Sequence, residues 1–302
     1  MTSASPSRAA GLGDIAAIAI CTLAWGTTWY AITLQLGVVD PIVSVVYRFA
    51  LASVLLFAFC IARGITLKLT RAQHLATFGV GLFTFAIDYS FVYWAEERVT
   101  SAVVAVVFAA LAFVNLAVFR IVFRERAPLM AWAAAGLGIA GVALLSWEEI
   151  ASARMSERAL AGIGLTLAGV LSAAIGNAYA RRGEIAGASV AASTGWAMFY
   201  GAALLAAFAL VTGRAWTVEL SWSYALSLLH LAVNGSVVAF LLYYGLARRR
   251  GYATASYISA LAPPVAMLVS SVFEAKTWGP LALGGVALVL AGQILLLRAR
   301  RA

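Results

Sequence analysis

Long apolar stretches that carry almost no charge are the feature that most limits what this chain can fold into. Ten of them occupy most of its 302 residues, of which 64% are hydrophobic and only 11% are charged. The hydrocarbon layer of a bilayer is about 30 Å thick, and a helix needs roughly 20 apolar residues to cross it. A water-soluble protein of this length requires far more charged surface. The sequence therefore predicts an integral membrane protein.

The ten stretches do not alternate polar and apolar residues, as membrane β-strands do. Only helices satisfy every backbone group within such segments. We therefore expect an all-α fold with ten transmembrane helices. The stretches run over 14–33, 41–62, 74–94, 100–123, 128–147, 160–181, 189–211, 224–247, 252–273 and 279–298.

Basic residues gather in the loops that lie on one side of such a bundle. If the N-terminus is cytoplasmic, 14 of the 21 Lys and Arg residues fall on the inner side and 5 on the outer side. Cytoplasmic loops carry this excess in membrane proteins. Both termini are therefore expected in the cytoplasm. The net charge of +9 can also indicate nucleic-acid binding, but the membrane explanation accounts for these clusters, so no nucleic-acid partner is expected.

Few residues of this chain are suited to metal or covalent chemistry. It has two cysteines and two histidines, which argues against a disulfide framework and a Cys/His metal site. No glycine-rich run followed by Lys and Ser or Thr is present, so ATP coupling is not expected. His74 and His230 fall near opposite faces, and Asp88 has no acidic partner at its depth. We expect no catalytic residues, no metal, no cofactor and no enzyme activity.

The sequence predicts a five-helix unit that occurs twice in the chain. The last helix of each half is rich in glycine and alanine, at 136–145 and 284–296. Because five is odd, the halves must lie oppositely in the bilayer, as in many transporters. Helices rich in Ala, Gly, Val and Leu also resemble one another by composition alone, which is the alternative. We expect a first repeat over 1–150 and an inverted second repeat over 151–302.

Several short motifs occur in the order of a known family. The sequence Ala-Trp-Gly-Thr-Thr-Trp-Tyr-Ala-Ile at 24–32 resembles the first-helix signature of the EamA branch of the drug/metabolite transporter superfamily. Tyr-Arg-Phe at 47–49, after Pro41, is similar to the second-helix signature, and Leu-Ala-Pro-Pro-Val at 261–265 to that of the ninth helix. The resemblance covers essentially the whole chain and implies a ten-helix secondary transporter. The chain most resembles the YddG-type aromatic amino-acid exporters.

Arg48 and Asp88 are charged residues deep within predicted helices, where a charge costs roughly 2.5–3.5 kcal/mol. Each lies about seven residues below the outer end of its helix. Adjacent antiparallel helices would bring both to one depth. We expect either a salt bridge that joins the two helices or, alternatively, a role for Asp88 as a proton site or as a contact for a substrate amine.

His230 and Asn234 lie one helical turn apart in the eighth helix and should point the same way. A histidine facing a cavity beside an asparagine can hold a substrate carboxylate and respond to pH near neutrality. The alternative is a hydrogen-bonded residue of the protein interior. We treat both as cavity candidates.

Aromatic residues give further candidates. Trp25 and Tyr89 lie deeper than the interfacial belt in which Trp and Tyr usually gather. With Tyr257 they would suit an aromatic or large aliphatic ligand. Pro263 and Pro264 remove hydrogen-bond donors from the ninth helix and predict a kink, which is either a gate or structural.

These observations, taken with the family resemblance, predict a secondary transporter in a bacterial cytoplasmic (inner) membrane. It would export amino acids, aromatic ones above all, and related metabolites by alternating access. Its expected partners are those substrates and the lipid bilayer. We expect a monomer, with a dimer as the alternative. The alternative functions are a multidrug or nucleoside exporter of the same superfamily, and a channel or scaffold.

Overall fold

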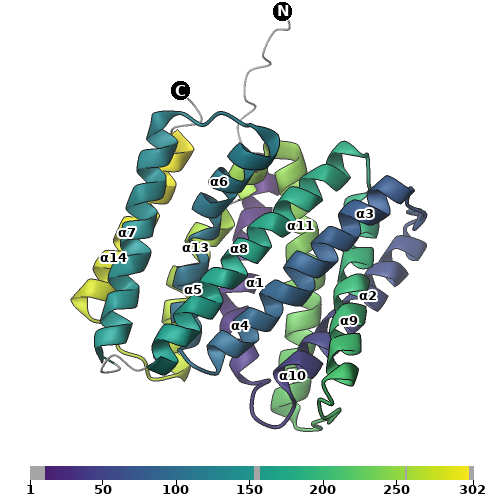
Figure 1. The fold of residues 1–302 in the computed structure, drawn as a ribbon, viewed down its shortest axis with the longest axis horizontal. Helices are drawn as coiled ribbons and strands as arrows, with labels where there is room; N and C mark the ends of the chain where they lie inside the picture. Colours follow the sequence, from purple (N-terminus) through teal and green to yellow (C-terminus); the bar gives the residue numbers. More distant parts are fainter. Residues whose placement is uncertain (1–10, 153–156, 256, 299–302) are drawn as a thin grey trace, which may run out of the picture.

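The computed structural model describes residues 11–152, 157–255 and 257–298, and within them every regular element is a helix (Figure 1). The expected all-α fold is confirmed for these residues. In chain order the elements are α1 (Leu12–Thr33), α2 (Pro41–Ala62), α3 (Arg71–Val80), η1 (Gly81–Asp88), α4 (Tyr89–Glu96), α5 (Ser101–Phe108), α6 (Leu111–Phe123), α7 (Leu129–Ser152), α8 (Glu157–Ile185), α9 (Val190–Val211), α10 (Trp222–Ala232), η2 (Val233–Val238), α11 (Ala239–Arg250), α12 (Tyr252–Ala255), α13 (Tyr257–Phe273) and α14 (Pro280–Arg298).

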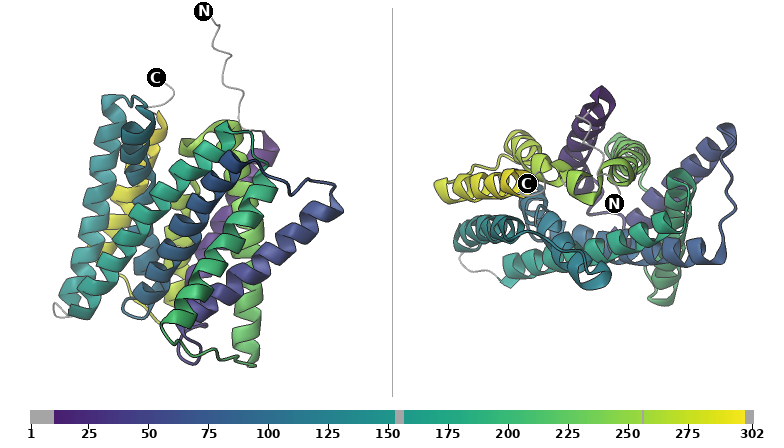
Figure 2. Two further views of the ribbon diagram at one scale, coloured as in Figure 1. Left: turned by 45° about the vertical axis from the view of Figure 1, so that its right-hand side comes forward. Right: turned by 90° about the horizontal axis from the view of Figure 1, so that it is seen from above.

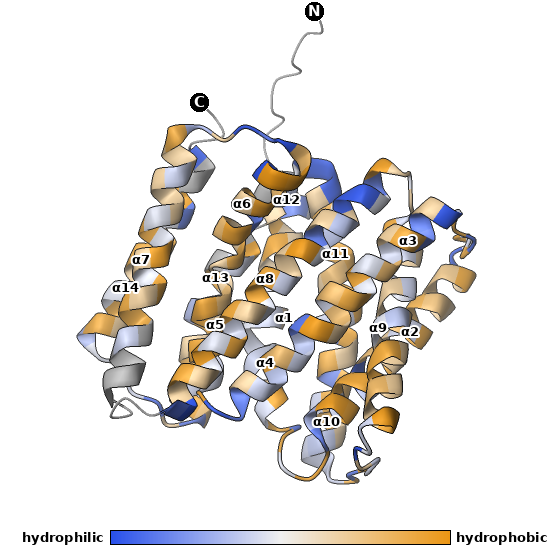
Figure 3. Cartoon of the chain, in the orientation of Figure 1, coloured by the Kyte–Doolittle hydropathy of each residue, from blue (hydrophilic) through white to orange (hydrophobic). Residues whose placement is uncertain are grey.

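Seven helices in the described residues are long and apolar enough to cross a membrane, and three further apolar helices are shorter. The seven are Leu12–Thr33, Pro41–Ala62, Arg71–Glu96, Ser101–Phe123, Glu157–Ile185, Val190–Val211 and Trp222–Arg250, and the shorter three are Leu129–Leu145, Leu261–Phe273 and Pro280–Leu295. Large apolar side chains such as Ile61, Leu75 and Leu171 are exposed on their outer faces. Figure 3 shows these apolar bands between more polar ends. Such a surface suits lipid rather than water.

Local capping explains where several helices begin. Asp40 precedes α2 and accepts a hydrogen bond from the backbone N–H of Ile42, and Pro41 occupies the first helical position. Thr70 and Gln73 form a reciprocal capping box at the start of α3. Each cap satisfies a backbone donor that the first turn leaves without an intrahelical partner.

The third and eighth apolar stretches each contain a π-helical segment. η1 joins α3 to α4, and η2 joins α10 to α11, so that each stretch stays helical throughout. A π-turn leaves carbonyl groups out of the α-helical pattern and is common at functional sites. Accordingly, the carbonyl oxygen of Phe83 in η1 accepts a hydrogen bond from Ser172, and that of Gly235 in η2 accepts one from Trp25.

Helices from the two halves of the chain pack against each other. α7 packs on α14, α2 on α9, and α1 on α13. Figure 1 shows α7 and α14 at one edge of the bundle and α2, α3 and α9 at the other. The helices α7 and α14 approach closely at Gly141: a Cβ atom added there would lie 2.5 Å from the carbonyl oxygen of Gly285. The small residues of these two helices thus pack within one chain.

The start of α1 and the end of α14 lie at the same end of the bundle (Figures 1 and 2). At that end Asp14 of α1 forms ion pairs with Arg249 and Arg250, at 3.2 and 2.7 Å. These pairs tie α1 to the end of α11. Cys21 and Cys60 are buried and free, with no disulfide in the described residues.

Candidate functional site

A central cavity lies among α1, α2, η1, α4, α5, α8, α11 and α13, with about 740 Å³ of atom-free space including its opening. The helices meet here because their small residues allow close approach: a Cβ added at Gly26 of α1 would lie 2.5 Å from Val265 of α13. Trp25, Arg48, Asp88 and Tyr89, four residues singled out from the sequence, all line this cavity. The fold therefore brings together side chains that are up to 64 positions apart in the chain.

Arg48 enters the cavity from α2 and is 1% exposed. Its Nε donates a hydrogen bond to Oγ of Ser236 at 3.0 Å, and its Nη2 lies 3.5 Å from the hydroxyl of Tyr89. The guanidinium carbon lies 4.6 Å from the centroid of the Tyr89 ring, a cation–π contact. Within the described structure Nη1 has no hydrogen-bond partner. Arg48 is thus held in place with one donor group unused.

Asp88 is the last residue of η1 and is 3% exposed. Its Oδ1 has no hydrogen-bond partner among the described residues. It lies beside Gly169 of α8, where an added Cβ would be 3.0 Å from that oxygen, so the glycine makes room for the carboxylate. The predicted salt bridge between Arg48 and Asp88 is wrong, because no ion pair joins them in the described part of the chain.

Arg48 contacts Ser236 of η2. The hydroxyl of Ser236 donates to the carbonyl of Leu231 and accepts from Arg48. Nε of Arg48 thus faces η2, and Asp88 lies against Gly169 of α8. The cavity thus holds one guanidinium and one carboxyl group that are not joined by an ion pair in the described residues.

Aromatic rings form much of the cavity wall. The centroid of the Trp25 ring lies 5.3 Å from those of Phe240 and Tyr243, and its Nε1 donates to the carbonyl of Gly235 at 3.1 Å. Tyr89 and Phe108 complete this wall. Such rings suit an apolar or aromatic ligand group.

His230 and Asn234 are close together, as their spacing predicts, but they do not line the central cavity. Nδ1 of His230 lies 3.1 Å from Nδ2 of Asn234, and Nε2 lies 3.0 Å from Oγ1 of Thr27. Asn234 is exposed. The expectation that both face the cavity is therefore corrected: this pair joins α10 and η2 to α1.

The ninth apolar stretch contributes Ser259 and Ala262 to the cavity. α13 stays helical through Pro263 and Pro264. Tyr257 is the first residue of α13, and its side chain lies outside the described part of the structure. The predicted gating role of these residues stays a prediction.

Some cavity residues were missed by sequence reasoning. Phe240 and Tyr243 line the cavity from α11, and Thr84 lines it from η1. Asn177 of α8 also lines it and donates to Asn115 at 3.2 Å. Phe240 and Tyr243 could have been identified from the sequence, because they are aromatic residues that follow Ser236 at helical spacing.

The described residues contain no group of three or more His, Cys, Asp or Glu side chains that could hold a metal ion. The site consists of one guanidinium, one carboxylate, aromatic rings and a few hydroxyl and amide groups. These groups can bind and orient a small molecule.

Comparison with known proteins identifies the family of this chain. The model of the EamA-like transporter family matches residues 12–147 and again 160–298. The uncharacterized inner membrane transporter YedA of Escherichia coli K12 is 29% identical over 259 residues, which cover 84% of this chain and 80% of YedA. Protein PagO of Salmonella typhimurium is 32% identical over 125 residues, 41% of this chain and 40% of PagO. A crystal structure with 20% identity, covering 96% of this chain and 99% of the other, has the same fold with a TM-score of 0.71.

Proposed function

This chain belongs to the EamA-like transporter family, and from that premise we propose that it is a secondary transporter that exports amino acids, aromatic ones above all, by alternating access. It is a multi-pass inner-membrane protein and a transporter rather than an enzyme, as its family and its relative YedA indicate. The finer resemblance to aromatic amino-acid exporters is part of this proposal.

One observation carries the proposal: the central cavity holds Arg48 and Asp88 without an ion pair between them, each with an unpartnered buried atom. Leaving such groups unsatisfied is costly, so a ligand that pairs with both is favoured. An α-amino acid carries a carboxylate that matches the guanidinium and an ammonium group that matches the carboxylate of Asp88. The rings of Trp25, Phe108 and Phe240 would contact its side chain.

The topology that we propose has ten spans, made of the seven long helices and the three shorter apolar ones, with both termini in the cytoplasm. The shared end of α1 and α14 supports an even number of spans (Figure 2). We also propose that residues 1–150 and 151–302 are inverted repeats. Two features support this: η1 and η2 occupy the third and eighth stretches, and Arg124 and Ala275, with φ of 56° and 52°, follow the fourth and ninth.

Transport by purified protein in liposomes tests the function. We expect saturable uptake of radiolabelled phenylalanine that other amino acids inhibit. Arg48→Lys and Asp88→Asn should each lower kcat/KM by about tenfold or more, since lysine cannot reproduce the planar fork of arginine and asparagine removes the anion. Arg120→Lys is the matched control, because Arg120 is exposed on α6 and does not line the cavity.

A second candidate function is export of lipophilic cations or nucleosides, which the aromatic wall and the unpartnered Asp88 favour. Uptake of a lipophilic cation that phenylalanine does not inhibit, with no uptake of phenylalanine itself, would replace the amino-acid assignment. Flux that does not saturate with substrate would indicate a channel instead.

A further inference from the structure

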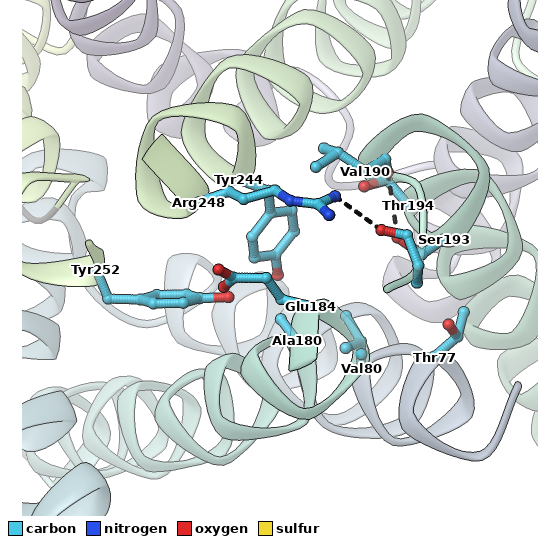
Figure 4. Close-up of a pocket in the computed structure, with 12 residues that line it drawn as sticks. Thr77, Val80, Ala180, Glu184, Val190, Ser193, Thr194, Tyr244, Arg248 and Tyr252 are labelled. Atoms are coloured by element: carbon cyan, nitrogen blue, oxygen red, sulfur yellow. Dashed lines mark hydrogen bonds between the residues drawn. The ribbon is translucent and has the colours of Figure 1, made fainter. Parts of the chain in front are cut away.

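A second cavity lies at the end of the bundle where Arg248–Arg250 terminates α11, the end that the charge distribution predicts to be cytoplasmic. It has about 460 Å³ of atom-free space, open solvent at its mouth included, between α3, α8, α9 and α11. Figure 4 shows Arg248 reaching toward it from α11 and Glu184 from α8. We call this space the vestibule. It is separate from the central cavity, with which it shares no lining residue.

The vestibule contains one positive and one negative side chain that are held by other partners. Nη1 of Arg248 donates to the carbonyl of Ala188 at 2.9 Å, and Oε1 of Glu184 accepts from Arg181 at 2.7 Å. No ion pair joins Glu184 to Arg248 in the part of the chain that the structure describes. A guanidinium has five N–H donors and a carboxylate about four acceptor sites, so both groups retain capacity for a ligand.

Two buried hydroxyl groups in the vestibule wall have no hydrogen-bond partner in the described structure. They are Oγ1 of Thr77, whose residue is 2% exposed, and the hydroxyl of Tyr244, whose residue is 8% exposed. Buried hydroxyls are nearly always paired with protein or with water, and each exception calls for an explanation.

The vestibule lies next to the central cavity, because three helical stretches (α3–η1, α8 and α11) contribute lining residues to both. Val80 and Thr84 are four residues apart on α3 and η1, and Asn177 and Ala180 are three apart on α8, with one of each pair in each cavity. One helical turn advances about 5.4 Å. Tyr244 stands at the boundary, with its ring centroid 5.7 Å from that of Phe240 in the central cavity. A molecule in the vestibule is thus about one turn from the central site.

From this geometry we infer that the vestibule is a second binding site for a zwitterionic α-amino acid, occupied before the central cavity. Arg248 binds the carboxylate, Glu184 binds the ammonium group, and the ring of Tyr244 separates this site from the central one. The inference rests on the proposed amino-acid transport and adds a loading site to it. It also assigns roles to Arg248 and Glu184, which the central cavity does not use.

Equilibrium binding of radiolabelled phenylalanine to the purified full chain in detergent tests the inference. Wild-type protein should bind phenylalanine at two sites per chain. Arg248→Gln and Glu184→Gln should each weaken one site by about tenfold, as expected for the loss of one charge-assisted contact. Arg48→Lys should weaken only the other site. Arg71→Gln is the matched control, because Arg71 is exposed at the start of α3 and lines neither cavity.

Competing ligands separate recognition from a structural role. Phenethylamine lacks the carboxylate, so Arg248→Gln should weaken binding of phenylalanine at the vestibule without weakening that of phenethylamine. Phenylpropionate lacks the amine, so Glu184→Gln should weaken binding of phenylalanine at the vestibule without weakening that of phenylpropionate. Loss of binding for all three ligands in either variant would indicate a structural role and overturn the inference.

The outcomes also separate this inference from the proposed function. A single site that Arg48→Lys weakens and the vestibule variants leave unchanged would overturn the vestibule assignment and leave amino-acid transport intact. No binding of phenylalanine to folded wild-type protein, together with no uptake in liposomes, would overturn both.

Discussion

Oγ of Ser236 accepts a hydrogen bond of 3.0 Å from Nε of Arg48, across 188 positions of the chain. The same hydroxyl donates to the carbonyl of Leu231, five residues earlier, at 2.8 Å. The π-helical segment η2 thus orients the hydroxyl that holds the guanidinium. This contact occupies Nε of Arg48 and leaves Nη1 without a partner among the described residues.

Replacing Ser236 with alanine should leave Nε of the buried Arg48 without its acceptor. We expect a loss of about 1–3 kcal/mol in stability, because a buried donor is left unsatisfied. The apparent melting temperature in detergent, followed by tryptophan fluorescence, measures it. Ser53→Ala is the control, since Ser53 is also buried but donates only to Ala50 of its own helix. Equal melting temperatures for the two variants would contradict the proposed role of Ser236.

The contact between α7 and α14 predicts opposite effects at two glycines of α7. A Cβ added at Gly141 would lie 2.5 Å from the carbonyl oxygen of Gly285, whereas one added at Gly136 would meet nothing within 4 Å. Gly141→Ala should destabilise the protein by about 1–3 kcal/mol through overpacking. Gly136→Ala should be neutral or stabilise it by up to about 1 kcal/mol, because alanine favours a helix. Thermal unfolding of both variants checks this, and a Gly141→Ala protein as stable as wild type would show that the helices can separate without cost.

Glu274 connects the end of α13 to the start of α5. Its Oε2 accepts from Oγ of Ser101 at 2.7 Å, and its Oε1 from the backbone N–H of Ser101 at 3.4 Å. A carboxylate there satisfies an N-terminal donor and interacts favourably with the helix dipole. Glu274→Ala should therefore cost about 0.5–2 kcal/mol of stability. Glu97→Ala serves as the comparison, because among the described residues the Glu97 carboxylate pairs with its chain neighbour Arg98. A smaller loss at 274 than at 97 would refute the capping role.

His230 should not determine substrate affinity, because its ring contacts Thr27 and Asn234 outside the central cavity. We expect His230→Gln to leave the KM for phenylalanine within about twofold of the wild-type value, as for a residue that makes no contact with bound substrate. Liposome uptake measured beside Asp88→Asn provides the comparison. A tenfold change in KM at His230, or loss of a pH dependence shown by wild type, would restore it as a site residue.

Much of the fold could be predicted because burial in lipid imposes a simple requirement on every segment. Stretches such as 41–62 and 189–211 correspond closely to α2 and α9, since a helix must stay apolar for as long as it crosses the bilayer. The candidate site could be predicted less well. Trp25, Asp88 and Tyr89 were expected in the cavity from their depth and line it, whereas His230 and Asn234 do not.

The sequence by itself determined that this is a helical membrane protein and that Arg48 and Asp88 lie deep within their helices. Apolar length and the position of a charge along a helix are local properties that need no knowledge of neighbouring helices. Only the tertiary structure decided which side chains meet, because helix rotation and the wider turns of η1 and η2 set the direction of each one. These turns bring Ser236 to Arg48, and helix rotation leaves Asp88 beside Gly169 and directs His230 toward Thr27 instead of the cavity.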